Sequence, residues 1–189
     1  MRVFIAVLVL IFSLQSWTKA DDISDFEIEG MSVGDSALDH FDEKDIKENL
    51  RTDWPNSKKF SRSFGLKKSN MSEYEQVMVI FKTKDNSFII HGISASILSD
   101  FKNCSRRKDK AVKEILDFFG DVERKSVKTE HSMDKDSLVN ADFMYFENGY
   151  SEISCYDWSK KMEKKYKDRF AVAIYSEELR NWLNNEAYK

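Results

Sequence analysis

The two cysteines are the residues of this chain with the most distinctive chemistry. Cys104 and Cys155 lie about 50 residues apart, and neither belongs to a CxxC motif. A thiol nucleophile needs a base, for which His91 and His131 are candidates, but no small-residue elbow precedes either cysteine. Two cysteines and three scattered histidines also lack the spacing of a zinc site. We therefore expect a structural disulfide between Cys104 and Cys155 in an oxidising compartment.

Carboxylates are abundant but are not arranged for catalysis. A glycosidase needs two carboxylates that face one cleft. The acidic residues near position 42 instead have spacings that mostly face water on a helix; they are Asp39, Asp42, Glu43, Asp45 and Glu48. Asp35, next to Gly34, has the position of a helix cap.

A basic segment near the C-terminus is the candidate contact surface. Lysines and an arginine are concentrated between positions 159 and 169, where an aromatic side chain lies among them and another precedes them. Such a loop suits an anionic partner, namely lipid headgroups, a cell-wall polymer or an acidic protein face. A charged loop that is only solvated is the alternative. The residues are Trp158, Lys160, Lys161, Lys164, Lys165, Tyr166, Lys167 and Arg169.

Residues 1–20 have the order of a secretory signal peptide. Arg2 supplies the positive start, residues 3–14 are nearly all apolar, and the small residues Thr18 and Ala20 precede a cut. The apolar run of about 12 residues is shorter than the roughly 20 that a membrane span needs. We expect cleavage near Ala20, export to the periplasm or the exterior, and no transmembrane segment in the mature chain. An uncleaved anchor or a buried N-terminal helix is the alternative.

The charge of the mature chain argues against nucleic acid as a partner. The leader holds two basic residues and no acidic one, so its removal takes the net charge from −3 to about −5. General nucleic-acid binding needs a basic footprint. The sequence contains no phosphate loop, GxGxxG, serine elbow or calcium loop, so we expect no cofactor, no metal and no catalytic residue with a local signature.

Periodicity and turn residues predict the elements that hold these side chains. Val112, Ile115 and Phe119 lie on one helix face, and Gly120 ends that helix, which begins after Cys104. The pair Asn148-Gly149 predicts a tight hairpin turn. Further helices are expected over 33–49 and after Ser176, and strands over 60–66, 75–82, 88–97, 138–146, 151–158 and 170–175.

These elements predict an α+β fold in a single domain over 21–189. Consecutive strands joined by tight turns are antiparallel, and helices in a minority pack on one face of such a sheet. We expect two layers, with an antiparallel sheet of about five or six strands and three helices mainly on one face. The polar segments 121–137 and 159–168 are predicted to be mobile loops.

Two segments carry a resemblance to known proteins. Residues 26–36 (FEIEGMSVGDS) and 154–159 (SCYDWS) resemble a family of small exported proteins of marine alphaproteobacteria, over most of the mature chain. That family is uncharacterised, so the resemblance implies a compartment and a domain size but no activity. Over fewer residues, Gly30-Met31-Ser32 resembles the helix start of small outer-membrane assembly lipoproteins (the BamE/SmpA type). The chain lacks their lipid-bearing cysteine, and this likeness favours an interaction module.

The sequence therefore favours a non-enzymatic module that binds a partner outside the cytoplasm, through its sheet face or the basic loop. An envelope hydrolase whose site has no local signature is one alternative. A module that inhibits another protein by plugging it is the other. A deep pocket with converging histidine and carboxylate groups would favour the enzyme, whereas an aromatic-rimmed face would favour binding.

Overall fold

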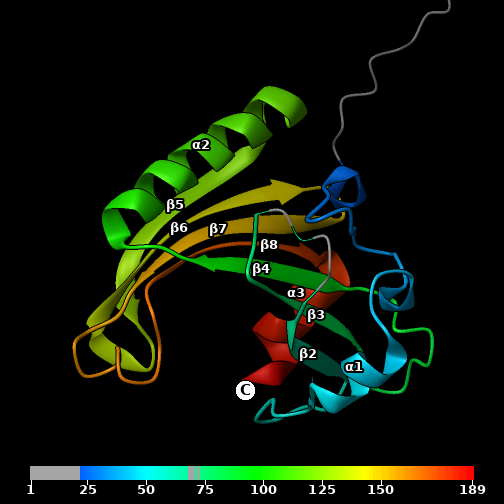
Figure 1. Cartoon of the computed structure of the whole chain (residues 1–189). Helices are drawn as coiled ribbons and strands as arrows, with labels where there is room; N and C mark the ends of the chain where they lie inside the picture. Colours follow the sequence, from blue (N-terminus) through cyan, green and yellow to red (C-terminus); the bar gives the residue numbers. More distant parts are fainter. Residues whose placement is uncertain (1–21, 68–70, 72) are drawn as a thin grey trace, which may run out of the picture.

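The fold is built on one antiparallel sheet, which arches across the molecule (Figure 1). The computed structural model describes residues 22–67, 71 and 73–189. The sheet has eight strands in the order β1-β2-β3-β4-β8-β7-β6-β5. Their bounds are Leu50–Arg51 (β1), Phe60–Leu66 (β2), Gln76–Lys82 (β3), Gly92–Leu98 (β4), Glu123–His131 (β5), Asp134–Phe146 (β6), Gly149–Asp157 (β7) and Arg169–Ser176 (β8).

Helices lie on both faces of this sheet (Figure 1). The long helix α2 runs over β7 and β8 on one face, and the short helix α3 contacts the same two strands from the other. Short helical turns fill the N-terminal region and the C-terminus. The bounds are Ile23–Asp25 (η1), Ala37–Asp39 (η2), Glu43–Glu48 (α1), Phe101–Phe119 (α2), Glu177–Trp182 (α3) and Leu183–Ala187 (η3, a π-helical turn).

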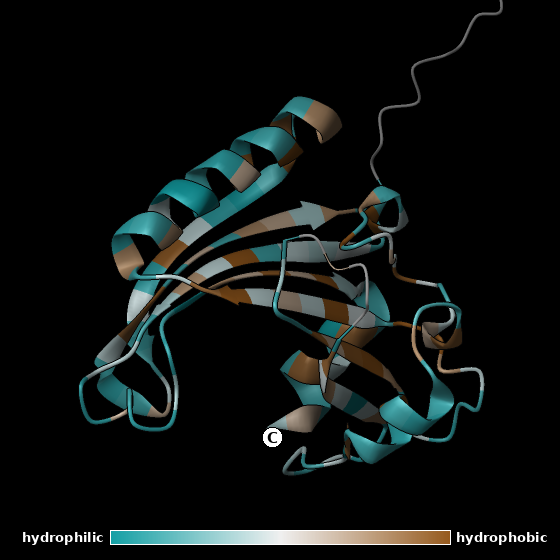
Figure 2. Cartoon of the chain, viewed as in Figure 1, coloured by the Kyte–Doolittle hydropathy of each residue, from teal (hydrophilic) through white to brown (hydrophobic). Residues whose placement is uncertain are grey.

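The larger core lies between α2 and the sheet. Val112, Ile115 and Phe119 repeat at helical spacing, so one face of α2 is apolar while the rest is hydrophilic (Figure 2). They pack on inward-facing residues of β7 and β8, among them Ile153 and Val172. The disulfide between Cys104 and Cys155 joins the first turn of α2 to β7 within this core.

A buried ion cluster also fixes α2 to the sheet. Asp142 in β6 has a fully buried side chain, and it accepts hydrogen bonds from Lys108 of α2 and from Ser126. Arg124 donates from Nε to Oδ1 of Asp142 at 2.8 Å, the oxygen that also accepts from Ser126. Burial alone would raise the pKa of Asp142, but these donors outweigh it, and the pKa is lowered from its ordinary value of 3.8.

A smaller core covers part of the opposite face. Trp182 and Leu179 of α3 pack against Phe60 and Ile80, and Trp54 meets Trp182 edge to face at 5.1 Å. Ser176 caps α3 by accepting from the amide of Leu179, as the sequence predicts for this helix start. The turn η3 continues α3 and adds Ala187 to this smaller core.

The predicted two-layer arrangement of five or six strands with helices mainly on one face is wrong. The sheet has eight strands and dominates the fold, and the helices α2 and α3 lie on opposite faces. The predicted strands formed in place, but two further strands, β1 and β5, extend the sheet at its edges. β1 has only two residues and β5 carries mostly polar and charged ones, so hydrophobic periodicity detects neither.

The prediction for segment 121–137 was wrong for the same reason, since its strands are polar. It was predicted to be a mobile loop, but it contains β5 and the start of β6, which are paired along nine positions. The predicted helix over 33–49 is instead the short turn η2 followed by α1. Asp35 does accept from the amide of Ser32 at 2.8 Å, as a returning cap bond would.

The predicted leader at 1–20 and its cut near Ala20 lie outside the described residues. Within the part of the chain that is described, no helix combines the length and the apolar character needed to cross a bilayer.

Candidate functional site

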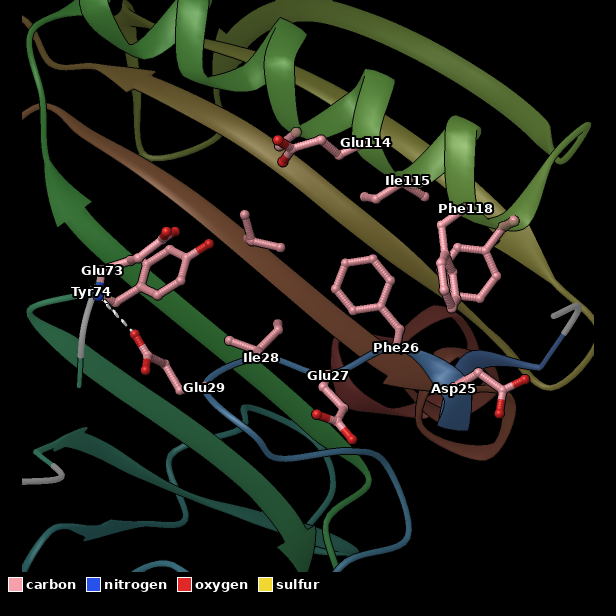
Figure 3. A pocket seen from close by; sticks show the side chains of 13 residues that line it. Asp25, Phe26, Glu27, Ile28, Glu29, Glu73, Tyr74, Glu114, Ile115 and Phe118 are labelled. Atoms are coloured by element: carbon pink, nitrogen blue, oxygen red, sulfur yellow. Dashed lines mark hydrogen bonds between the residues drawn. The ribbon is translucent and has the colours of Figure 1, made fainter. Parts of the chain in front are cut away.

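A cavity of about 370 Å³ opens between α2, the N-terminal segment 25–29 and residues 73–74, which precede β3 (Figure 3). Its volume lies within the range of small-molecule and side-chain pockets. The base is apolar and the rim is acidic. The lining residues are Asp25, Phe26, Glu27, Ile28, Glu29, Glu73, Tyr74, Ala111, Glu114, Ile115, Phe118, Phe119 and Val172.

The N-terminal segment forms one wall because its residues alternate. Phe26 and Ile28 point toward α2, while Glu27 points away from it (Figure 3). Phe26 stacks on Phe119 of α2 with ring centroids 5.9 Å apart. This extended segment therefore presents apolar side chains to the cavity and carboxylates to water.

A tight turn holds the end of that segment. Glu29 and Gly30 both have positive φ, of 53° and 72°, and Ile28 and Met31 exchange backbone hydrogen bonds across them. This is the two-residue turn in which both central residues are left-handed. Glu29 is a non-glycine residue in that region, and its carboxylate accepts from the amides of Glu73 and Tyr74. Those bonds tie the segment to the start of β3.

Helix α2 forms the opposite wall with a second stripe of residues. Ala111, Glu114, Ile115 and Phe118 recur at three- and four-residue spacing, so they lie along one side of the helix. Phe118 is 67% exposed although it is a large apolar side chain. Its ring meets that of Phe119 edge to face at 4.8 Å. The cavity thus has an exposed aromatic side chain at its mouth.

The charged residues that line the cavity are all acidic. Five of the described residues that line it are Asp or Glu and none is Lys, Arg or His. Burial, together with the neighbouring carboxylates of Glu73 and Glu29, raises the pKa of Tyr74 to about 12. Glu114 also forms an exposed ion pair at 3.4 Å with Lys110, which lies outside the lining and neutralises this one carboxylate. The cavity therefore favours a positively charged guest.

The side chains that line this cavity are acidic, aromatic or aliphatic. Its lining has no serine, cysteine, histidine or lysine that could act as a nucleophile. Among the described residues, no three His, Cys, Asp or Glu side chains are grouped to hold one metal ion. What remains is an apolar base surrounded by carboxylates, an arrangement that matches an amphipathic cation.

The predicted disulfide is confirmed, and both of its cysteines are buried. No free cysteine occurs among the described residues, so neither sulfur is a thiol nucleophile. His91 and His131 lie far from each other in the fold: His91 Nδ1 is 3.2 Å from Ser176 Oγ beside α3, whereas the ring of His131 packs on Trp158 at 4.5 Å.

The basic loop lies on the other face of the sheet from the cavity. Four of the predicted contact residues line a second groove, of about 820 Å³; they are Lys165, Tyr166, Lys167 and Arg169. Lys160, Lys161 and Lys164 are exposed but do not line it. Trp158 is buried and stacks on Tyr166 at 4.7 Å, so it supports the loop from beneath.

Sequence reasoning missed the acidic-rimmed cavity. The alternation Phe26-Glu27-Ile28-Glu29 was a usable signal, since it is the pattern of an extended segment with one apolar face. Phe118 was a second signal, because it lies outside the apolar helix face and so has no place in the core. Neither pattern indicates that these two segments meet.

Comparisons with protein-family models, with curated proteins and with solved structures find no match for this chain.

Proposed function

We propose that this protein is a non-enzymatic binding module of an oxidising compartment outside the cytoplasm, either the periplasm or the exterior. Its ligand is a basic peptide segment of a partner protein. One large apolar side chain of that segment enters the cavity beneath α2, and flanking lysines or arginines meet the carboxylates at the rim. The disulfide supports the compartment, as do the leader predicted at residues 1–20 and the resemblance of the sequence to small exported proteins.

A single observation carries this proposal: an apolar cavity has five acidic residues in its lining and no basic one. A neutral apolar ligand would gain nothing from that rim, and an anion would be repelled by it. A small polyamine would leave the exposed ring of Phe118 without an apolar group of the ligand against it. A peptide that combines an apolar anchor with flanking cations uses both features, as anchors in pockets do at protein interfaces.

The hydrolase alternative would need two of these carboxylates to act as acid and base on one bond, whereas the apolar base and the exposed ring of Phe118 favour binding. A module that inhibits another protein would use the same contacts, so it is a special case of the proposed binding.

The test is a titration of the mature protein with short synthetic peptides, followed by calorimetry. A peptide with one phenylalanine flanked by lysines is expected to bind. Replacing its phenylalanine by serine, or its lysines by glutamates, should weaken binding by about tenfold or more, since burying a phenyl group contributes roughly 1.5–3 kcal/mol. Binding should also weaken as salt is added.

Matched variants locate the site. Phe118→Ser removes the exposed ring and should lower the affinity for the basic peptide by about tenfold. Leu38→Ser removes another exposed apolar side chain, 40% exposed and absent from the cavity lining, and should leave the affinity unchanged. Equal affinities of both variants, or equal binding of the glutamate-flanked peptide, would contradict the proposal.

A further inference from the structure

A groove on the sheet face opposite α2 has five basic and two acidic residues in its lining. Its residues come from β1 to β4, from the loop between β7 and β8, and from the turn between β5 and β6. In Figure 1 that loop and that turn lie next to each other at the lower left. The lining is Arg51, Asp53, Arg62, Phe64, Glu75, Gln76, Ser96, Leu98, Met133, Lys165, Tyr166, Lys167 and Arg169.

The strand register fixes which face this groove occupies. Gln76 pairs with Ser96, and Leu98 pairs with Arg169, so these residues share one face. Their sequence neighbours Val77 and Phe170 belong to the core under α2. The groove and the acidic-rimmed cavity are therefore on opposite faces of the sheet.

The positive charge of the groove is largely uncompensated. Arg62 is neutralised by Asp53, which it contacts through two hydrogen bonds of 2.9 and 3.2 Å. Lys165, Lys167 and Arg169 form no ion pair with any described residue, and the same holds for Arg51. The groove has one further carboxylate, that of Glu75. Four cations thus face one free anion.

A contact with an aromatic ring positions the side chain of Arg169. Its guanidinium lies over the ring of Tyr156 at 5.2 Å. Its buried Nε has no hydrogen-bond partner among the described residues. A buried donor without a partner is uncommon and is usually met by a ligand or water.

Hydrogen bonds within the loop between β7 and β8 hold the segment that supplies Lys165 and Lys167. The amide of Trp158 donates to the carboxylate of Asp168 at 2.8 Å, which closes the base of the loop. The amides of Met162 and Tyr166 form turn bonds of 2.8 Å. Tyr166 then stacks on Trp158, and the ammonium of Lys165 lies over the ring of Tyr166 at 5.2 Å.

Apolar side chains line the same groove. Six large hydrophobic side chains are exposed among the described residues, and three of them are in this lining: Phe64 at 47%, Leu98 at 57% and Met133 at 56%. A free phosphate would leave these three in water. An amphiphile with an anionic head and a hydrocarbon tail covers both kinds of side chain.

We propose that this groove binds an anionic phospholipid, with its phosphate against Arg169, Lys165 and Lys167 and an acyl chain along Phe64, Leu98 and Met133. The protein thereby docks on membranes that contain anionic lipid. This site is independent of the peptide-binding cavity, which lies on the other face of the sheet.

The experiment measures co-sedimentation of the mature protein with vesicles. Vesicles of phosphatidylcholine and phosphatidylglycerol in equal amounts should bind it, and vesicles of phosphatidylcholine alone should not. The double variant Lys165→Glu/Lys167→Glu should lower the partition coefficient by about tenfold or more. Lys160→Glu/Lys161→Glu makes the same charge change in the same loop but outside the groove, and should lower it far less.

A second pair of variants tests the acyl chain. Leu98→Ser/Met133→Ser should reduce vesicle binding several-fold, because apolar contact with the acyl region is lost. Leu38→Ser is the control and should have no effect. These side chains are exposed, so the folded state is preserved; far-ultraviolet circular dichroism checks this.

Competition distinguishes the anion sources. Soluble glycerol phosphate and polyglutamate should fail to displace the protein from the mixed vesicles. Displacement by glycerol phosphate would assign the groove to a free phosphate, and displacement by polyglutamate would assign it to an acidic protein. Either result would overturn the proposal, as would equal losses in the groove and control lysine variants.

Discussion

Asp142 is the residue on which the attachment of α2 to the outer strands depends. It lies in the middle of β6, directly opposite Ser126 of β5, and its side chain is fully buried. Lys108 reaches it from α2 and is itself almost fully buried. Removing one partner of such a pair leaves the other charged and desolvated, which costs more than the pair contributes.

We expect Asp142→Asn to lower the free energy of unfolding by about 3–5 kcal/mol at neutral pH. The matched control is Lys113→Ala, which removes an exposed ion pair with Asp117 on the same helix and should cost less than about 1 kcal/mol. Urea unfolding measures both. Similar losses in the two variants would show that the buried cluster contributes no more than a surface pair.

The stability difference between the wild type and Asp142→Asn is also expected to depend on pH. The folded-state pKa of Asp142 is lowered from 3.8, so its stabilising contribution is present above pH 3.8 and is lost as the pH falls through the folded-state pKa. The difference in unfolding free energy between the wild type and Asp142→Asn should therefore shrink below pH 3.8. A difference that stays constant with pH would contradict this assignment.

At the scale of elements, the turn of the hairpin β6–β7 lies one residue earlier than expected. The pair Asn148-Gly149 was expected at the centre of the turn, but Glu147 and Asn148 form the turn and Gly149 begins β7, opposite Phe146. The tertiary packing around residue 149 explains why it is a glycine. A Cβ at position 149 would lie 2.1 Å from the carbonyl oxygen of Tyr175 and 2.9 Å from a side-chain carbon of Ile23. Glycine is required here by close backbone approach.

Gly149→Ala is therefore expected to destabilise the protein by about 2 kcal/mol or more, because the backbone of β8 cannot yield to the added methyl group. Gly65→Ala is the control: its φ of 81° is strained for alanine, but nothing lies within 4 Å of the added Cβ. It should cost about 1 kcal/mol. Thermal unfolding ranks the two, and an equal or smaller loss at position 149 would refute the close-approach explanation.

Strand β5 shows why an edge element escaped prediction. Its sequence, ERKSVKTEH, has no apolar alternation and is largely exposed. It forms because β6 offers a complete ladder and because Arg124 and Ser126 hydrogen-bond to the buried Asp142. Its charged side chains also discourage pairing with other chains at this open edge.

At the scale of the whole molecule, the sheet separates two candidate binding surfaces of opposite charge. The acidic-rimmed cavity lies on the α2 face, and the basic groove lies on the other. A protein built in this way could hold a basic partner segment while its opposite face rests on anionic lipid. Both surfaces depend on the sheet, and the cavity also depends on the position of α2, which the disulfide fixes.

Removing the disulfide tests that dependence. The double variant Cys104→Ala/Cys155→Ala opens a loop with a sequence separation of 51 and should lower the free energy of unfolding by about 4 kcal/mol in the chain-entropy model. Urea unfolding of the oxidised wild type, the reduced wild type and the variant checks this. The reduced wild type should resemble the variant, and an unchanged stability in both would show that the bridge adds little.

Much of the fold could be read from local patterns. Strands such as 75–82 and 170–175 and the helix ending at Gly120 follow from β-branched runs and from apolar periodicity. The disulfide followed from two cysteines and a predicted oxidising compartment. The number of strands and the placement of α3 did not follow, because pairing at polar edges and the choice of sheet face depend on the register between distant segments.

The basic loop was recognised from its charge, but its partners in the groove were not. Lys165 and Arg169 are joined there by Arg51 and Phe64, which lie far away in the sequence. By itself, the sequence determined most of the elements, because periodicity and turn residues act over a few neighbouring positions. Only the tertiary structure decided that residues 25–29 meet α2 to form an acidic-rimmed cavity, because a cavity exists only where segments distant in the chain pack without filling the space between them.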